Sequence, residues 1–308
     1  MKYKVLVTAP YLQLVIKDYQ QIFDFHDIEI IVPQVKERMS EEELLEHIGD
    51  IDAILCGDDR ITENVLARAP KLKVISKWGT GIDSIDKEAA LKRGIPVRNT
   101  VNAFTDPVAD TVLGLILCFS RGILDLNEKM HQGIWTKDLK WALNEKTLGV
   151  VGVGNVGKAV IKRAEVFGMR ILANDIKEIP GYNLVPLEQL LREADFVSIN
   201  CDLNPTSRYL INKEKIALMK PTAYLINTAR GPIVKEADLI EALGNKKIAG
   251  AGLDVFEDEP LAEENPLKKM SNVILSPHNA NAGAAAWKRV HENTIKNAIY
   301  ELIKHINS

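Results

Sequence analysis

The chain of 308 residues carries 39 basic and 42 acidic side chains, for a formal net charge of −3, and 46% of its residues are hydrophobic. This balanced charge argues against a general electrostatic attraction to nucleic acid or to an anionic membrane surface. The length exceeds what a single hydrophobic core normally supports, so we expect two domains.

The cysteines and the apolar segments predict a soluble cytoplasmic protein without a metal centre. Cys56, Cys118 and Cys201 are widely spaced and form no Cys/His ligand cluster, which speaks against a disulfide framework or structural zinc. The N-terminal MKYKVLVTAPYL lacks the apolar core and cleavage site of a signal peptide. The longest apolar run, from Val112 to Phe119, is too short to span a bilayer.

Strand-like runs alternate with helical patterns through the first hundred residues. Ser40 and Glu43 form a capping-box pattern at the start of an amphipathic segment that ends near Gly49. Alternation of this kind, with nearly continuous apolar strands, is typical of a parallel sheet covered by helices on both faces. The predicted strands are Lys4 to Ala9, Ile28 to Pro33, Asp52 to Cys56, Leu72 to Trp78 and Ile95 to Asn99.

A long helical segment separates this region from a second alternating series. Thr105 suits an N-cap and Pro107 the first turn of a helix that continues to about Gln132. The later strand-like runs are TLGVVGVG, ILANDI, FVSIN, AYLINTA, IAGAGLDV and NVILSP. A final helix from about Ala284 to Ile306 is a candidate for returning to the first unit, so the sequence predicts two α/β units.

Gly152, Gly154 and Gly157 form a GxGxxG pattern between a predicted strand and a predicted helix. The first glycine permits a tight turn, the second lets a pyrophosphate approach the backbone, and the third lets the helix pack against its strand. Asp175 follows the next strand at about the spacing of an acid that binds the adenosine ribose, where it would repel a 2′-phosphate. The motif predicts NAD in preference to NADP; the alternative is an ordinary glycine-rich turn.

Three later strands end in chemically unusual side chains. They are Arg230, Asp254 with Glu259 just beyond it, and His278. Ligands of open parallel sheets bind beyond the carboxyl ends of the strands, so these groups could converge beside a nicotinamide. Carbonyl reduction needs a proton donor, which histidine beside a carboxylate can be, while arginine can bind a substrate carboxylate. Alternatively, each is an ordinary loop residue: Arg230 pairs with a surface acid, Glu259 is a solvated acid, and His278 bonds only to the backbone.

These motifs resemble the D-isomer-specific 2-hydroxyacid dehydrogenases, in the branch similar to 3-phosphoglycerate dehydrogenase but without a regulatory domain. The resemblance covers essentially the whole chain and includes KWGTGIDSID, GxGxxG with Asp175, NPTSRYLIN, NTARGPIVKEADLIEAL, AGLDVFEDEP and SPH. It implies an α/β fold of two flavodoxin-like or Rossmann-like domains with parallel sheets. A discontinuous substrate domain would take residues 1–99 and 284–308, and an NAD-binding Rossmann domain residues 100–283. The family's active site lies between the domains, and the family usually forms a homodimer through the NAD domain.

The resemblance also implies roles for individual residues. His278 matches the general acid/base, Glu259 the acid paired with it, and Arg230 the arginine that binds the substrate carboxylate and polarises the 2-oxo group. Asp254 matches an acid near the nicotinamide carboxamide. The substrate-binding positions are Lys77, Gly79, Thr80, Gly81 and Arg230. The cofactor-binding positions are Gly152, Gly154, Asn155, Val156, Gly157, Asp175, Cys201, Thr228, Ala229 and Asp254.

We therefore predict an NAD-dependent oxidoreductase that interconverts a 2-oxo acid and a D-2-hydroxy acid by hydride transfer. Possible substrates are 3-phosphoglycerate, glycerate or glyoxylate, or another small 2-hydroxy acid. The alternative is an NAD-sensing regulatory protein on the same fold, similar to transcriptional corepressors that retain the same catalytic set.

Several positions depart from the family pattern and bear on the substrate. Cys56 and Gly57 replace an Arg-Ser pair that resembles the phosphate grip of 3-phosphoglycerate dehydrogenases, although Lys77 is basic where those enzymes have arginine. Phe104 stands where asparagine is usual and is a candidate for limiting substrate size. The segment after the histidine is also atypical, with Asn279, Asn281 and Gly283.

Overall fold

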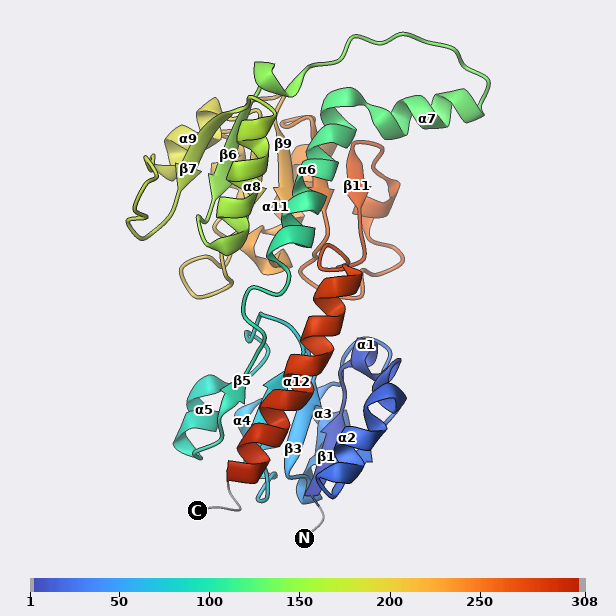
Figure 1. The fold of residues 1–308 in the computed structure, drawn as a ribbon. Helices are drawn as coiled ribbons and strands as arrows, with labels where there is room; N and C mark the ends of the chain where they lie inside the picture. Colours follow the sequence, from blue (N-terminus) through green and yellow to red (C-terminus); the bar gives the residue numbers. More distant parts are fainter. Residues whose placement is uncertain (1–2, 305–308) are drawn as a thin grey trace. The chain divides into compact units, whose positions relative to one another are not determined.

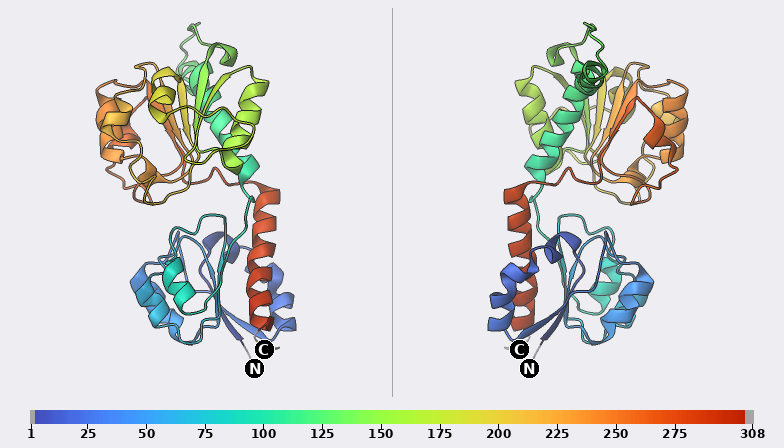
Figure 2. Two further views of the ribbon diagram at one scale, coloured as in Figure 1. Left: turned by 90° about the vertical axis from the view of Figure 1, so that its left-hand side faces the viewer. Right: turned by 90° about the vertical axis from the view of Figure 1, so that its right-hand side faces the viewer.

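The computed structural model describes residues 3–304, which belong to two compact units. The discontinuous unit comprises Met1–Phe104 and Gly283–Ser308, and the continuous unit comprises Thr105–Ala282. Each is built on one parallel sheet with helices on both faces (Figures 1 and 2). The predicted α/β fold class is confirmed.

The sheet of the discontinuous unit has the strand order β2-β1-β3-β4-β5. All four residues of β3 are buried, which explains its unbroken apolar sequence; all four of β4 are buried as well, although this strand ends in Ser76 and Lys77. The fifth strand is shorter than predicted, since Pro96 has no N–H to donate to the ladder. The strands are β1 (Tyr3–Val7), β2 (Ile28–Ile31), β3 (Ala53–Cys56), β4 (Val74–Lys77) and β5 (Val97–Arg98).

Helices from both ends of the chain cover this sheet. The C-terminal helix α12 (Ala284–Lys304) packs on β3, β4 and β5, and Ser76 Oγ donates a hydrogen bond to its Thr294 carbonyl oxygen at 2.7 Å. On the other face lie α3 (Glu41–His47), α4 (Glu63–Ala67) and α5 (Lys87–Lys92), which contribute apolar side chains to a shared core. The predicted capping box is confirmed, with Ser40 and Glu43 each bonded to the other's backbone. The remaining helices are α1 (Pro10–Gln13) and α2 (Gln20–Phe25).

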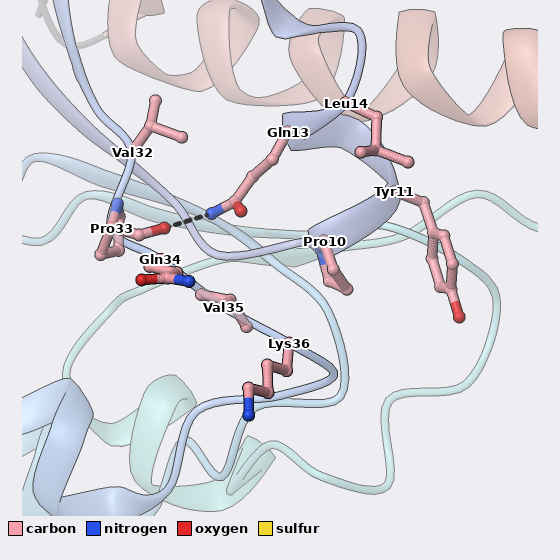
Figure 3. Close-up of a pocket in the computed structure, with 9 residues that line it drawn as sticks. All are labelled: Pro10, Tyr11, Gln13, Leu14, Val32, Pro33, Gln34, Val35 and Lys36. Atoms are coloured by element: carbon pink, nitrogen blue, oxygen red, sulfur yellow. Dashed lines mark hydrogen bonds between the residues drawn. The ribbon is translucent and has the colours of Figure 1, made fainter.

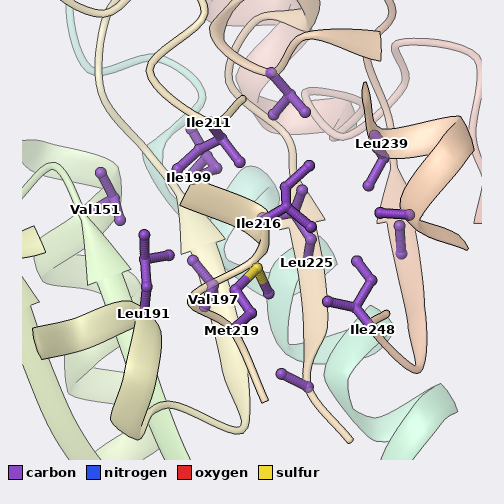
Figure 4. Close-up of a cluster of buried hydrophobic side chains, with 14 of the residues drawn as sticks. Val151, Leu191, Val197, Ile199, Ile211, Ile216, Met219, Leu225, Leu239 and Ile248 are labelled. Carbon is purple, nitrogen blue, oxygen red and sulfur yellow. The ribbon is translucent and has the colours of Figure 1, made fainter. Parts of the chain in front are cut away.

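The continuous unit has a six-stranded parallel sheet in the order β11-β10-β9-β8-β6-β7. Residues of β6 (Thr147–Val151) contribute to two cores. Leu148 and Val150 join the core that includes side chains of α6 (Thr105–Arg121) and α8 (Asn155–Val166), whereas Val151 joins the core that includes Leu191 and Ile199 (Figure 4). The strands are β6 (Thr147–Val151), β7 (Arg170–Asn174), β8 (Phe196–Ile199), β9 (Tyr224–Asn227), β10 (Gly250–Leu253) and β11 (Val273–Leu275). The helices besides α6 and α7 are α8 (Asn155–Val166), α9 (Leu187–Glu193), α10 (Lys213–Ile216) and α11 (Glu236–Gly244).

The prediction of one helix from Thr105 to about Gln132 is wrong. The chain forms α6 (Thr105–Arg121) and α7 (Ile123–His131), bent by 59° at Gly122. Gly122 has a φ of +61°, in the left-handed region that glycine adopts most readily, and this ends the first helix. Within residues 3–304 no single helix has the length and apolarity to cross a bilayer, and only this bent pair meets both measures when its two parts are combined.

Candidate active site

The candidate active site of the continuous unit lies at one edge of its sheet. Because all its paired strands run parallel, their carboxyl ends meet at this edge. The turns and loops that start there carry the residues predicted for cofactor binding and catalysis. They are Gly152 after β6, Asp175 after β7, Cys201 after β8, Thr228 after β9, Asp254 after β10 and His278 after β11.

The three motif glycines meet different surroundings. Gly152 has a φ of +91°, and a Cβ there would lie 2.6 Å from the Cys201 nitrogen. A Cβ on Gly157 would lie 2.0 Å from the Gly152 carbonyl oxygen. By contrast, a Cβ on Gly154, the N-cap of α8, would meet nothing within 4 Å. Gly152 and Gly157 are therefore required by packing, whereas Gly154 faces open space.

This open space fits the diphosphate of NAD. The helix begins at Asn155 and Val156, and the N–H groups of a first helical turn have no intrahelical acceptor, so they suit an anion. Thr228 adds a second observation: its Oγ1 is buried and has no hydrogen-bond partner among the described residues. A buried hydroxyl without a partner is costly unless a ligand bonds to it.

Asp175 is fixed beside the glycine-rich turn. Its Oδ2 accepts a hydrogen bond from the Val153 N–H at 2.8 Å, and its Oδ1 accepts one from the Lys177 N–H at 3.0 Å. These bonds hold the carboxylate in one orientation next to the turn and leave acceptor capacity on both oxygens. After β8, on the other side of β6, burial raises the pKa of the Cys201 thiol to about 11, so the thiol stays protonated at neutral pH.

His278 and Glu259 form a histidine–carboxylate pair. The His278 Nδ1 lies 2.8 Å from Glu259 Oε2, and each side chain is about one-fifth exposed, at 22% and 21%. The other carboxylate oxygen, Oε1, accepts the Phe256 N–H at 2.9 Å. Both partners are thus held, and because the pairing uses Nδ1, the ring presents Nε2 on the side away from Glu259.

Asp254 supports the loop that carries His278. It is 1% exposed, and its two carboxylate oxygens accept the N–H groups of Asn279 and Ala280, each at 2.9 Å. Its carbonyl oxygen also accepts the His278 N–H at 2.8 Å, and His278 itself has a φ of +51°. The buried carboxylate therefore fixes an uncommon backbone conformation at the histidine.

Asn227 is a site residue that the sequence analysis did not identify. It is 1% exposed at the end of β9, donates from Nδ2 to the Arg230 carbonyl oxygen at 3.0 Å and accepts the Ala229 N–H at 3.1 Å. It shapes the turn that presents Arg230, whose Nη1 donates to the Ala229 carbonyl oxygen at 2.8 Å. The available signal was an amide that ends an otherwise apolar strand, YLIN.

The other predicted substrate-binding residues lie in the discontinuous unit: Lys77 ends β4, and Gly79, Thr80 and Gly81 follow it. Gly79 has a φ of +122°, a backbone conformation that residues with a side chain rarely adopt, so glycine is favoured at this position. The Thr100 N–H donates to the Gly79 carbonyl oxygen at 2.9 Å, and Thr80 Oγ1 donates to the Thr100 carbonyl oxygen at 2.9 Å. The loop that contains Gly79, Thr80 and Gly81 is therefore braced by the segment after β5.

A hollow of about 460 Å³ opens beside the loops that follow β1 and β2 (Figure 3). Tyr11 and Lys36 contribute to its lining, and Gln13 Nε2 donates to the carbonyl oxygens of Val7 at 2.7 Å and Pro33 at 2.8 Å. These bonds join α1 to the end of β1 and to the segment after β2. None of the residues predicted for catalysis, cofactor binding or substrate binding lines the hollow.

Comparisons with known proteins identify the family. Residues 113–280 match the NAD binding domain of the D-isomer specific 2-hydroxyacid dehydrogenases. Glyoxylate reductase of Thermofilum pendens is 44% identical over 84% of this chain and 81% of its own length. Glyoxylate reductase of Thermococcus litoralis is 38% identical over 97% and 93%. D-3-phosphoglycerate dehydrogenase of Methanocaldococcus jannaschii is 39% identical over 92% of this chain, which spans 55% of that protein.

A solved structure agrees with these relatives. D-Lactate dehydrogenase from Aquifex aeolicus, complexed with NAD and lactic acid, superposes with a TM-score of 0.89 over 98% of this chain and 96% of that one, at 28% identity. The predicted family, cofactor and reaction type are confirmed, and the relatives named above give no support to the NAD-sensing alternative. The chain belongs to the D-isomer-specific 2-hydroxyacid dehydrogenase family and is an NAD-dependent D-2-hydroxyacid dehydrogenase.

Proposed function

We propose that His278 is the acid/base of this dehydrogenase and that Glu259 orients it. The observation that carries the proposal is the 2.8 Å pair between His278 Nδ1 and Glu259 Oε2, at the sheet edge that also bears the glycine-rich turn. When bound, NADH supplies the hydride to the carbonyl carbon. His278 gives its Nε2 proton to the carbonyl oxygen, and Glu259 stabilises the protonated ring before transfer. In the reverse direction neutral His278 takes the hydroxyl proton.

Arg230 and the loop after β4 bind the substrate in this proposal. Arg230 contributes a guanidinium that binds the carboxylate of the 2-oxo acid and polarises its carbonyl group. The N–H groups of Thr80 and Gly81, next to Gly79 with its φ of +122°, form a nest for the carboxylate. We assign the continuous unit as the NAD-binding domain and the discontinuous unit as the substrate domain.

The substrate is a small 2-oxo acid, and the relatives named glyoxylate reductase favour glyoxylate. The test is NADH oxidation by the purified protein over a panel of glyoxylate, pyruvate, hydroxypyruvate, 3-phosphohydroxypyruvate and larger 2-oxo acids. We expect turnover of one or more small members to a D-configured product. Tight NADH binding without turnover of any panel member contradicts the proposal.

We further propose a cytoplasmic homodimer formed through the continuous unit. Its support is the helix α7 and the connection after it, which expose large apolar side chains: Met130 is 53% exposed, Trp135 78% and Leu139 100%. Exposed apolar groups on one segment are typical of an association surface. The three cysteines are all free thiols, as suits a reducing compartment. Sedimentation at micromolar concentration measures the oligomeric state, and a monomer there contradicts the dimer.

Asp175→Ala is expected to reduce the preference for NADH over NADPH about tenfold or more. The variant loses acceptors for the adenosine ribose hydroxyls and the negative charge that repels a 2′-phosphate; a tenfold change corresponds to ~1.4 kcal/mol. The measurement is kcat/KM for both cofactors with one 2-oxo acid. Glu178→Ala removes a nearby exposed acid and serves as the charge-matched control. An unchanged preference in Asp175→Ala rules out the ribose assignment.

A further inference from the structure

A buried ammonium lies under the proposed substrate loop of the discontinuous unit. Lys77 is 4% exposed, and its Nζ donates to the Trp78 carbonyl oxygen at 3.1 Å. A Cβ placed on Gly79 would lie 3.8 Å from this Nζ and 3.5 Å from Cε2 of Phe104. A side chain at the first residue of the loop would therefore meet both the ammonium of Lys77 and the ring of Phe104.

The charge of Lys77 is already neutralised. Its Nζ lies 3.0 Å from Oδ1 of Asp58, whose side chain is 43% exposed. A second acid, Asp59, follows directly and is fully buried. Its carboxylate accepts hydrogen bonds from Thr8 Oγ1 at 2.6 Å, from the Met39 N–H at 2.7 Å and from the Gly57 N–H at 2.8 Å. These bonds fix the loop after β3, so Asp58 is presented to Lys77 by a rigid turn.

The end of β3 and the first position after it offer an anion no donor side chain, and the basic residue of the following loop, Arg60, is exposed and comes after the buried Asp59. Cys56 is fully buried, burial raises the pKa of its thiol, and the next position is Gly57. A 2-oxo acid with one carboxylate has its partner in the backbone N–H groups of the substrate loop. A phosphate on C3 adds close to two further negative charges. These charges would be repelled by the Asp58 carboxylate, and the Lys77 ammonium that could attract them is already paired with Asp58.

We propose that Asp58 is a specificity residue that neutralises Lys77 and restricts the enzyme to 2-oxo acids whose C3 substituent is uncharged. The inference rests on the proposed function, because it takes the loop of Gly79 to Gly81 as the substrate carboxylate site. The position of Phe104 also supports this inference. Its ring packs on Trp78 with centroids 5.7 Å apart and, like the Lys77 ammonium, has an atom within 4 Å of the Cβ position of Gly79.

The test compares hydroxypyruvate with 3-phosphohydroxypyruvate, which differ only by the phosphate. In the wild-type enzyme we expect kcat/KM for the phosphorylated acid to be at least about tenfold below that for hydroxypyruvate. Asp58→Asn keeps the side-chain shape but removes its charge, so the ratio of phosphorylated to unphosphorylated kcat/KM should rise about tenfold or more. Combining Asp58→Asn with Lys77→Met should abolish that rise, because the unpaired ammonium is its source.

Asp50→Asn is the matched control, since Asp50 also pairs with lysines but precedes β3, whereas Asp58 follows it. The control should leave the ratio unchanged. A wild-type preference for 3-phosphohydroxypyruvate, or an Asp58→Asn ratio within about twofold of wild type, overturns the inference while leaving the proposed function intact. Failure of the wild-type enzyme to reduce any member of the 2-oxo acid panel overturns both.

Discussion

Replacing His278 by asparagine is expected to lower kcat for 2-oxo acid reduction by about 10²–10⁴-fold, the usual contribution of a general acid. Asparagine fits the space and can hydrogen-bond to Glu259, but it has no acidic proton to give to the carbonyl oxygen at neutral pH. NADH affinity should stay within about twofold, because the glycine-rich turn and Asp175 are unchanged. Single-turnover reduction and NADH fluorescence titration measure the two quantities separately. A variant that loses NADH affinity but keeps its turnover would falsify the assignment of His278.

Glu259→Gln is the companion variant that separates orientation from proton transfer. In the wild-type protein the Phe256 N–H donates to Glu259 Oε1 at 2.9 Å, and glutamine keeps an oxygen that can accept this bond. The substitution removes the negative charge that stabilises a protonated His278 ring. Its loss of kcat should therefore be smaller than that of His278→Asn, and the double variant should lose little more than His278→Asn alone. Losses that simply add would show that the two side chains act independently.

Much of the candidate site could be predicted from the sequence because it depends on local order. The glycine motif and Asp175 lie close together in the chain, around one strand–helix–strand unit, and their spacing alone places them at one edge of a parallel sheet. The same rule placed Arg230 and His278 at that edge, since each follows a strand directly. These expectations needed only the knowledge that the strands run parallel.

The contacts that the sequence did not predict depend on which strands are neighbours. Lys77 and Asp58 are paired because β3 and β4 are adjacent, so that Cys56 and Lys77 are register partners. The bonds of Asp254 to the backbone after His278 likewise require β10 beside β11. The bend at Gly122 was missed for another reason: an isolated glycine inside a helical pattern is compatible with either a continuous or a broken helix.

Gly231→Ala is expected to lower the free energy of unfolding by about 3 kcal/mol or more and to abolish most activity. A Cβ at this position would lie 1.8 Å from the carbonyl oxygen of Phe256 and 1.9 Å from its carbonyl carbon. Both atoms are backbone, so no side-chain rotation relieves the clash, and the segments after β9 and β10 must separate. Arg230 precedes the glycine, and Glu259 is bonded to the Phe256 N–H, so the separation displaces two proposed catalytic groups. Denaturant unfolding and NADH oxidation measure the two effects, and a variant with wild-type stability would contradict the close approach.

Gly154→Ala is the matched control, and it should give the opposite pattern. Its Cβ would meet nothing within 4 Å, and Gly154 has a φ of −73°, which alanine adopts without strain. Stability should stay within about 0.5 kcal/mol of wild type, as expected for a substitution that creates neither clash nor cavity. NADH affinity should nevertheless fall about tenfold or more, because the added methyl group occupies the approach of the diphosphate to the turn. One methyl group would then act on stability at Gly231 and on cofactor binding at Gly154. That difference follows from whether protein backbone or open space faces the glycine.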